Sequence, residues 1–269
     1  MAVERVYSRV HNRSVNARFH VPDARASGDL VSLSEEEAQH LVRVLRLGVG
    51  AAVRVFDGQG HEFDAVVDTA GKPGVTVRVG APREPAPEPR LVLTLAQAVL
   101  KGDKMDDVVR DAVMMGVAAI QPIVTERTEV SLAVLERGSR QARWQRIAVS
   151  SAKQCGRAVV PMVALPIAFD ALLDALKTFK VPGPALLFTE PAAARDAVPL
   201  TELTSVAPRE ATLIVGPEGG WTPAEIERAS SSSTQVGVCR LVTLGGRTLR
   251  ADAVPMVAIA ALFAVWKEY

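Results

Sequence analysis

Hydrophobic positions follow a short alternating rhythm in the first part of the chain. Three β-branched segments have this rhythm: 51–57, 63–69 and 74–80. The turn sequences DGQG and GKPG separate them, so the pattern predicts short antiparallel strands of a small β-barrel. A helical period interrupts the strands at 34–48. Ser34 is a suitable N-cap for this predicted helix, with Glu37 three residues later, and Gly48 is a suitable stop.

After residue 90 the rhythm becomes an alternation of buried strands and amphipathic helices. The predicted strands cover 91–99, 117–124, 185–188, 212–215 and 236–242. The predicted helices cover 103–116, 143–154 and 169–179, then a segment that begins at Thr222, and finally 253–266. Such an alternation predicts an α/β fold whose mostly parallel sheet carries helices on both faces.

A proline-rich stretch separates the two rhythms. Residues 81–90, APREPAPEPR, contain four prolines and no apolar period, which is typical of a semi-rigid linker. A chain of 269 residues is also long for one average domain. We therefore predict a β-barrel at 1–80, a linker at 81–90 and an α/β domain at 91–269.

Composition excludes several classes of protein. Apolar residues make up 48% of the chain and charged residues 23%, as in soluble globular proteins. The longest apolar run, 253–266, is shorter than the ~20 residues that cross a bilayer, so we expect a buried or interface helix and no membrane span. No apolar stretch follows the first arginines, which argues against a secretory signal. Cys155 and Cys239 lack the number and spacing of a disulfide framework or zinc site, so we expect a cytoplasmic protein without a metal.

Basic residues gather at the N-terminus although the net charge is only +1. The segment 5–20 contains no acidic residue and four arginines: Arg5, Arg9, Arg13 and Arg18. This pattern fits a solvated terminus or an arm that contacts phosphates, and both interpretations stay open. If the terminus is only solvated, Arg43, Arg46 or the α/β domain would have to contact a nucleic acid.

Two glycine loops follow neighbouring predicted strands. The first lies in LIVGPEGGWTPAEI, residues 213–226, and the second in LVTLGGRTLRADAVPM, residues 241–256. Ligands of open α/β sheets bind beyond the carboxyl ends of the strands, so the two loops predict one pocket. Neither loop contains the phosphate-binding or dinucleotide-binding glycine pattern, and Glu218 would repel a phosphate. All four histidines precede the linker, which excludes a histidine-based triad or metal cluster in the α/β part.

These loops carry a resemblance that further segments extend over nearly the whole chain. The segments are HLVRVLRLGVG (40–50), FDGQGHEFDA (56–65), LKGDKMD (100–106), ERTEV (126–130) and KQCGRAVVP (153–161). Together they resemble the trefoil-knotted, S-adenosylmethionine-dependent SPOUT RNA methyltransferases. More narrowly, they resemble the family that methylates N3 of a uridine in 16S ribosomal RNA.

The resemblance implies a PUA-like RNA-binding barrel, a deep trefoil knot in the α/β domain, a homodimer, and 16S rRNA in the small ribosomal subunit as partner. It implies S-adenosylmethionine as cofactor, held by Leu187, Thr189, Gly216, Pro217, Glu218, Gly219, Gly220, Val242, Leu244, Gly245 and Leu249. The RNA-binding residues would be Arg5, Arg9, Arg13, Arg18, Arg43, Arg46, Lys101 and Arg247.

The catalytic residues expected from this chemistry are Arg250 and Asp252. Arg250 would stabilise the negative charge that develops on a uracil oxygen, and Asp252 would orient Arg250 or assist removal of the N3 proton. Four positions depart from the family's usual pattern: Asp111, Met114, Lys153 and Asp252. Asp111 and Lys153 either form an ion pair with exchanged charges or changed independently.

Two other functions stay open. The same chemistry could act on another ribosomal or transfer RNA nucleotide, or the chain could be a non-catalytic RNA-binding factor of ribosome assembly.

Overall fold

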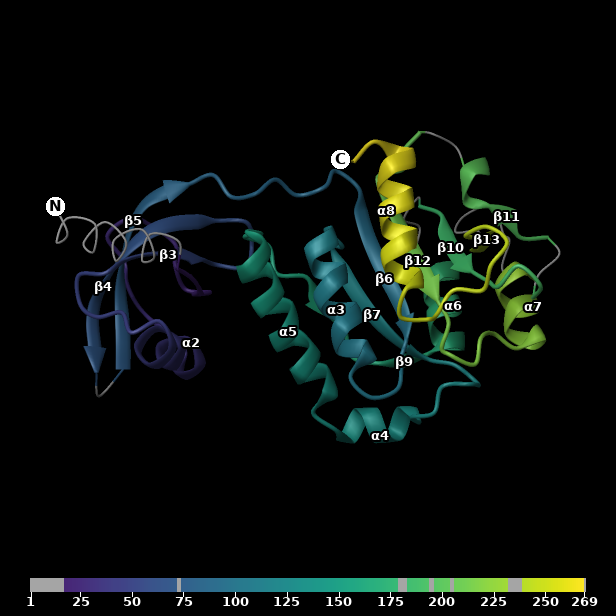
Figure 1. Cartoon of the computed structure of the whole chain (residues 1–269), viewed down its shortest axis with the longest axis horizontal. Coiled ribbons are helices and arrows are strands. Elements are labelled where there is room, and N and C mark those ends of the chain that lie inside the picture. Colours follow the sequence, from purple (N-terminus) through teal and green to yellow (C-terminus); the bar gives the residue numbers. More distant parts are fainter. Residues whose placement is uncertain are drawn as a thin grey trace, which may run out of the picture. The chain divides into compact units, whose positions relative to one another are not determined.

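The computed structural model describes residues 17–71, 74–178, 183–193, 196–203, 206–231 and 239–268. The chain divides into two compact units (Figure 1). The first unit is Met1–Glu88 together with Ala152–Val160, and the second is Pro89–Ser151 together with Pro161–Tyr269.

The first unit contains a five-stranded sheet in the order β1-β3-β4-β5-β2. Its strands are β1 (Arg18–His20), β2 (Leu30–Ser32), β3 (Ala52–Phe56), β4 (Glu62–Gly71) and β5 (Gly74–Arg83). The pairs β3–β4, β4–β5 and β2–β5 are antiparallel, whereas β1 and β3 are parallel. The three strands predicted from the β-branched segments are therefore present, and β1 and β2 add to them.

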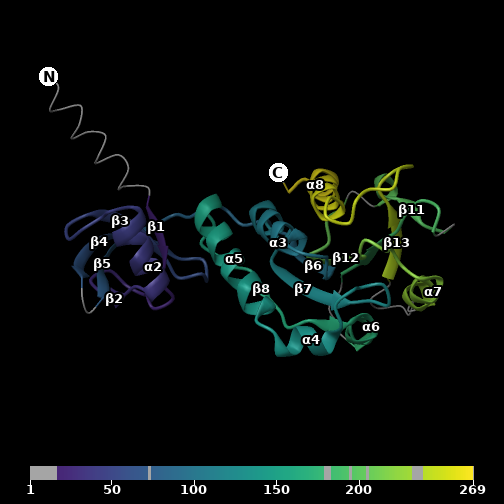
Figure 2. The ribbon, with the colours of Figure 1, turned by 60° about the horizontal axis from the view of Figure 1, so that its bottom comes forward.

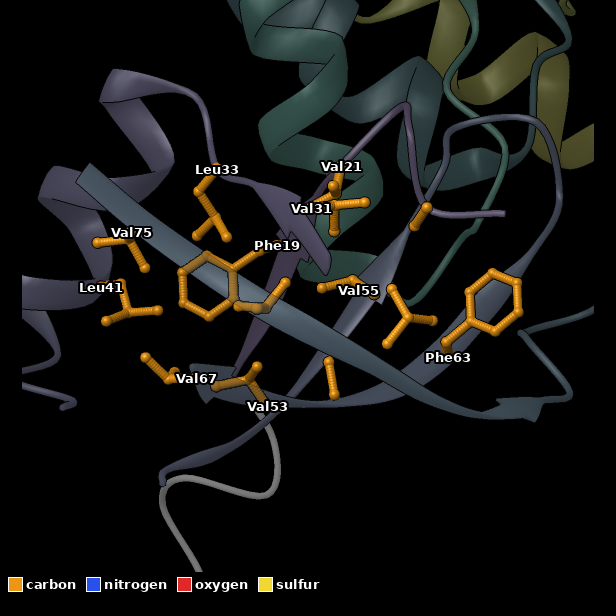
Figure 3. Packing of buried hydrophobic residues seen from close by; sticks show 14 residues of the cluster. Phe19, Val21, Val31, Leu33, Leu41, Val53, Val55, Phe63, Val67 and Val75 are labelled. Atoms are coloured by element: carbon orange, nitrogen blue, oxygen red, sulfur yellow. The ribbon is translucent and has the colours of Figure 1, made fainter. Parts of the chain in front are cut away.

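Alternate residues of these strands form the core of the first unit (Figure 3). Val53 and Val55 of β3 and Val75, Val77 and Val79 of β5 are at most 3% exposed. Side chains of a strand alternate between its two faces, so one face of the sheet is apolar and buried. Each fully buried side chain of this size contributes roughly 1.5–3 kcal/mol.

The helix of the first unit is shorter than the predicted one. Helix α2 (Glu35–Gln39) begins where Ser34 accepts a hydrogen bond from the Glu37 amide at 3.3 Å. It continues as a π-helix, η1 (His40–Val44), in which the Leu45 amide donates to the carbonyl of His40. Arg46 then adopts a positive φ of 54°. The regular α-helix predicted for 34–48 is thus wrong after Gln39, because the backbone there makes wider i→i+5 bonds.

Segment Ala152–Val160 is anchored in the first unit by ion pairs, although it lies far away in the sequence. Lys153 donates to both carboxylate oxygens of Glu37 at 3.0 and 2.8 Å. Arg157, which is 5% exposed, pairs with Glu88. Asp111 instead accepts from Arg110 at 2.7 Å. Asp111 and Lys153 therefore each have another ion-pair partner within their own unit, which supports independent changes at the two positions.

The second unit is built on an eight-stranded sheet in which every described strand pair is parallel. Its order is β11-β13-β10-β12-β6-β7-β8, with β9 also beside β7. The strands are β6 (Val92–Ala98), β7 (Ala119–Val124), β8 (Met162–Val163), β9 (Ile167–Ala168), β10 (Ala185–Phe188), β11 (Val198–Pro199), β12 (Glu210–Val215) and β13 (Cys239–Thr243). The predicted parallel sheet is confirmed.

Helices cover both faces of this sheet, with α3 and α8 on one face and α6 and α7 on the other (Figure 2). The helices are α3 (Lys104–Met115), α4 (Leu132–Arg137), α5 (Arg140–Cys155), α6 (Phe169–Thr178), α7 (Pro223–Ser231) and α8 (Val254–Trp266), with a 3-10 turn η2 (Leu200–Glu202). The short α4 is not predicted by the hydrophobic pattern. Among the described residues, no helix is long and apolar enough to cross a membrane.

The sheet order brings three strand ends together. Phe188 at the end of β10 is in register with Val215 of β12 on one side and with Val242 of β13 on the other. The segments that follow these strands begin at Thr189, Gly216 and Leu244. Because the strands are parallel, all three segments leave the same edge of the sheet.

Candidate functional site

A cavity of about 310 Å³ lies at the carboxyl ends of β10, β12 and β13. The segment after β10 lines it with Thr189, Glu190 and Pro191. The glycine loop after β12 and the loop before α8 line the rest, and Lys104 of α3 adds one side chain. The two glycine loops of the sequence therefore share one pocket, as predicted.

Two glycines of GPEGG are required by the local geometry. Gly220 has a φ of +67°, and a Cβ atom there would lie 3.2 Å from Oε1 of Glu190. A Cβ atom on Gly216 would lie 2.9 Å from the Trp221 ring. Left-handed backbone strains any residue with a side chain at position 220, and a Cβ atom on residue 216 would overlap the Trp221 ring. The wall of the cavity is therefore bare main chain at these points.

An indole and a guanidinium hold the glycine loop in place. Nε1 of Trp221 donates to the carbonyl of Phe188 at 2.8 Å, and its ring packs on Phe169 at 4.8 Å between centroids. Arg127 donates to the carbonyls of Gly219 at 2.8 Å and Trp221 at 3.3 Å. The loop after β12 is thereby tied both to β10 and to the turn after β7.

The end of the glycine loop is fixed by a reciprocal cap. The Thr222 amide donates to Oε2 of Glu225 at 2.9 Å, and the Glu225 amide donates to Oγ1 of Thr222 at 3.2 Å. The other carboxylate oxygen of Glu225, which is 1% exposed, accepts from the Glu126 amide. This capping box is the one that the sequence predicts, and it defines where α7 begins.

Glu218 is held as a carboxylate at the mouth of the cavity. It accepts hydrogen bonds from Nζ of Lys104 at 2.9 Å and from the Lys101 amide at 3.2 Å. Partial burial raises the pKa of Glu218, but these hydrogen bonds outweigh burial and hold the pKa below its ordinary value. Glu218 therefore stays ionised and paired with α3 at neutral pH.

Arg250 and Asp252 form a two-pronged ion pair on the opposite loop. Nε and Nη2 of Arg250 each donate to one oxygen of Asp252 at 3.0 Å. The hydrogen bond from Arg250 lowers the pKa of Asp252 below its ordinary value. Asp252 thus orients the Arg250 guanidinium, and an acid with a lowered pKa is a weak proton acceptor near neutral pH.

A buried hydroxyl in the cavity wall has no hydrogen-bond partner among the described residues. Thr189 is 8% exposed, lines the cavity, and leaves Oγ1 unsatisfied. An unpaired buried polar atom costs roughly 1–3 kcal/mol unless a ligand or water satisfies it. The cavity therefore offers a polar contact, main-chain groups and an apolar wall, which is typical of a site for a small molecule or cofactor.

The structure brings most predicted site residues together. The cavity is lined by Thr189, Gly216, Pro217, Glu218, Gly220, Leu244, Arg247, Leu249, Arg250 and Asp252. Leu187 and Val242 do not line it, because both are fully buried within β10 and β13. Gly219 packs against Arg127 instead, and Gly245 is also outside the lining.

Sequence reasoning missed Lys104 and Glu190 in the lining and Arg127 behind it. The sequence signal that could have found them is their place after predicted strands. Glu190 stands two residues after β10, and Arg127 lies in the turn after β7. Only the sheet order shows that these turns meet.

The predicted RNA-binding residues lie in different surroundings. Arg5, Arg9 and Arg13 fall outside the described residues. Arg43 and Arg46 are exposed, as are Arg247 and Lys101, although Lys101 pairs with Glu129 at 2.5 Å.

Arg18 is enclosed in the first unit. Its guanidinium donates to Glu62 at 3.2 and 2.8 Å and to the carbonyls of Ala152, Lys153 and Arg157 at 3.1, 2.8 and 3.1 Å. All five N–H donors are used, so Arg18 is not available for the phosphate contact predicted for it.

Acidic, histidine and cysteine side chains do not gather into a metal site anywhere in the part of the chain that the structure describes.

Comparison with known families defines the class of this protein. Residues 87–263 match the family described as RNA methyltransferase domain, and residues 33–80 match the RNA methyltransferase PUA domain. The chain therefore belongs to the RNA methyltransferases, with a PUA-like domain before the catalytic one.

Individual relatives show which family of RNA methyltransferases the chain belongs to. The chain is 33% identical to ribosomal RNA small subunit methyltransferase E of Synechocystis, over 87% of this chain and 73% of the relative. It resembles the crystal structure of the enzyme of that name from Neisseria gonorrhoeae, bound to S-adenosylmethionine, with a TM-score of 0.80 and 32% identity over 93% of this chain and 98% of the other. A methyltransferase from Legionella pneumophila with bound cofactor gives a TM-score of 0.81 and 30% identity, covering 92% and 96%. The chain is a member of the ribosomal RNA small subunit methyltransferase E family.

Proposed function

We propose that the protein transfers a methyl group from S-adenosylmethionine to N3 of a uridine in 16S ribosomal RNA. The observation that carries the proposal is the cavity at the ends of β10, β12 and β13. Its glycine loop exposes main-chain groups to a ligand, and the unsatisfied hydroxyl of Thr189 lies in the same wall. Two solved relatives at 30% and 32% identity bind S-adenosylmethionine. The name of the relative from Synechocystis gives small-subunit ribosomal RNA as the substrate of that enzyme.

The residues that would hold the cofactor are Thr189, the main chain of Gly216, Pro217 and Gly220, and the apolar side chains of Leu244 and Leu249. When bound, the cofactor supplies an electrophilic methyl group. Leu187 and Val242 support the site from within their strands, and Gly219 and Gly245 shape the loops beside it.

Arg250 would stabilise the charge of the uracil during methyl transfer. Loss of the N3 proton leaves negative charge on the neighbouring oxygens, and a guanidinium held in place by Asp252 is suited to it. The N3 proton passes to the solvent, whose hydroxide is a stronger base than the carboxylate of Asp252 with its lowered pKa. Positioning of the uracil supplies much of the remaining acceleration.

We further propose a trefoil knot and a homodimer. In the sheet, β13 lies between β10 and β11, although it comes after both of them in the sequence. Helix α8 then follows β13. This order supports threading of the C-terminal segment through the connection between β10 and β11. Helix α8 supports a dimer, because it is apolar on all sides and leaves Val257 43% exposed.

RNA would be bound by basic residues of both units. We propose that the first unit is a PUA-like barrel and the second a knotted domain, in a cytoplasmic protein. Strand β5 runs to Arg83, so the predicted barrel boundary at residue 80 and linker at 81–90 begin three residues too early. Arg43 and Arg46 in the first unit and Lys101 and Arg247 in the second are exposed and suited to phosphate contacts. Arg5, Arg9 and Arg13 remain proposals from the sequence.

The test is transfer of labelled methyl groups to small-subunit RNA, as naked rRNA and as assembled subunits, followed by mass spectrometry of the modified nucleotide. We expect 3-methyluridine at one position. Arg250→Ala should lower the transfer rate by about 10²-fold or more while RNA affinity is nearly kept. The control is Arg240→Ala, an exposed residue of β13 outside the cavity lining.

Three results would contradict this proposal. Methylation of another nucleotide would assign the same chemistry to a different substrate. RNA binding without any methyl transfer would make the chain an assembly factor. Full activity of Arg250→Ala would remove Arg250 from the mechanism.

A further inference from the structure

The cavity contains three carboxylates, and two of them are neutralised by the protein. Glu218 is paired with Lys104 at 2.9 Å, and Asp252 is paired with Arg250 at 3.0 Å. Glu190 also lines the cavity, but among the described residues no cation lies within ion-pairing distance of it. Glu190 is therefore the carboxylate of the cavity lining that has no ion-pair partner in the part of the protein that the structure describes.

The fold places Glu190 in the cavity lining, next to Thr189 and opposite the glycine loop. It follows β10, the strand between β12 and β13, and comes directly after Thr189 with its unsatisfied hydroxyl. Its Oε1 lies 3.2 Å from the position that a Cβ atom of Gly220 would occupy. The carboxylate thus stands against the bare main chain of the glycine loop.

Methyl transfer changes the charge of the cofactor by one unit. The bond between the methyl carbon and sulfur breaks, its electron pair stays on sulfur, the carbon bonds to the uracil nitrogen, and the N3 proton passes to hydroxide of the solvent. The positive sulfonium becomes a neutral thioether, while the amino acid, ribose and adenine stay the same. A lone carboxylate nearby therefore stabilises the methyl donor more than the product.

We propose that Glu190 selects the charged methyl donor over S-adenosylhomocysteine and so favours exchange of product for substrate. This inference rests on the proposed function of the same cavity. We take a separation of roughly 8 Å between the two charges, which is about the diameter of a sphere with the cavity's volume of about 310 Å³. The Coulomb energy at that distance corresponds to roughly 2-fold in affinity in bulk water and roughly 30-fold at an effective dielectric constant of 20. Glu190 is exposed, and we expect about 3-fold to 10-fold.

The test compares the affinities of the two ligands by titration calorimetry on the full chain. Glu190→Gln keeps the shape of the side chain and removes its charge. We expect the variant to bind S-adenosylmethionine about 3-fold to 10-fold more weakly and S-adenosylhomocysteine as tightly as the wild type. Glu227→Gln, an exposed residue of α7 outside the cavity, is the matched control and should change neither affinity. Glu190→Asp keeps the charge and should keep most of the preference for S-adenosylmethionine over S-adenosylhomocysteine.

Other outcomes overturn the inference. Equal weakening for both ligands would show that Glu190 contacts a group that they share, such as the ribose or the ammonium. Unchanged affinities would show that Glu190 takes no part in binding. If the wild type binds neither ligand, the proposed function itself fails, whereas binding without selection contradicts only the role of Glu190. Circular dichroism of each variant separates these results from a loss of fold.

Discussion

Arginines of the two units differ in how much of their hydrogen-bonding capacity the protein itself uses. Arg18 in the first unit donates all five N–H groups to Glu62 and to three carbonyls, and its side chain is 9% exposed. Arg250 in the second unit directs Nε and Nη2 to Asp252 and is 74% exposed. The first guanidinium joins distant segments of the fold, and the second is oriented but still open to a substrate.

The same contrast holds for carboxylate and hydroxyl groups. In the first unit, Asp57 accepts three hydrogen bonds from Gln59 and His61 and is 2% exposed. In the second unit, Thr189 keeps an unsatisfied hydroxyl and Glu190 has no cation beside it among the described residues. Saturated polar groups stabilise a fold, whereas polar groups left open at a cavity mark a binding site.

The largest effect, a loss of cofactor affinity, is expected when a side chain is introduced into the cavity wall at the GPEGG loop. Gly220→Val places a β-branched residue at a φ of +67° and against Glu190. We expect cofactor affinity to fall by about 10²-fold or more, measured by calorimetry on a variant that circular dichroism shows to be folded. Gly48→Val is the control, because a Cβ atom there meets nothing within 4 Å. Undiminished affinity would remove the GPEGG loop from the cofactor site.

The next effect concerns the saturated arginine. Arg18→Ala leaves Glu62 buried and unpaired and three carbonyls without a donor, so we expect the free energy of unfolding to fall by about 3–5 kcal/mol. Urea unfolding measures it, and Arg43→Ala, which removes an exposed guanidinium, should change it by less than about 0.5 kcal/mol. Affinity for the cofactor should stay the same. If Arg18→Ala instead weakens RNA binding at unchanged stability, Arg18 contacts RNA.

A smaller effect should appear in the pH dependence of stability. Burial raises the pKa of Asp57, but hydrogen bonds from His61 and Gln59 outweigh burial and hold the pKa below its ordinary value. The unfolded chain therefore takes up the proton first, and the stabilisation is complete above about pH 5 and is lost as the pH falls below about 4. Melting temperatures between pH 2 and 6 measure it. Asp57→Asn should show a shallower acid limb, and an identical limb would contradict the assignment.

The smallest effect is expected at two exposed arginines, Arg43 of η1 and Arg46 just after it. Replacing Arg43 and Arg46 by Ala should weaken RNA binding a few-fold, without a change in cofactor affinity. Each lost phosphate contact should flatten the slope of log K against log salt by roughly 0.7 to 0.9. Filter binding at several salt concentrations measures the slope. An unchanged slope would leave RNA contacts to Lys101, Arg247 or the N-terminal arginines.

The hydrophobic pattern alone determined most elements of this protein. Alternation of period two predicted β3, β4 and β5 because one face of their sheet is buried, as Val53 and Val55 show. Continuous apolar runs predicted β6, β7, β10, β12 and β13, and the pair Thr222 and Glu225 predicted the start of α7. These features depend on neighbours in the sequence, so a local pattern is sufficient to predict them.

Only the tertiary structure decided which polar side chains keep hydrogen-bonding groups free for a ligand. Arg18 and Arg250 look alike in the sequence, but the donors of Arg18 are taken by Glu62 and by Ala152–Val160, which is more than a hundred residues away. Glu190 faces Gly220 only because β10 lies beside β12. The contacts that satisfy or expose a polar group come from strand order and from segments far apart in the chain, and no local period reports them.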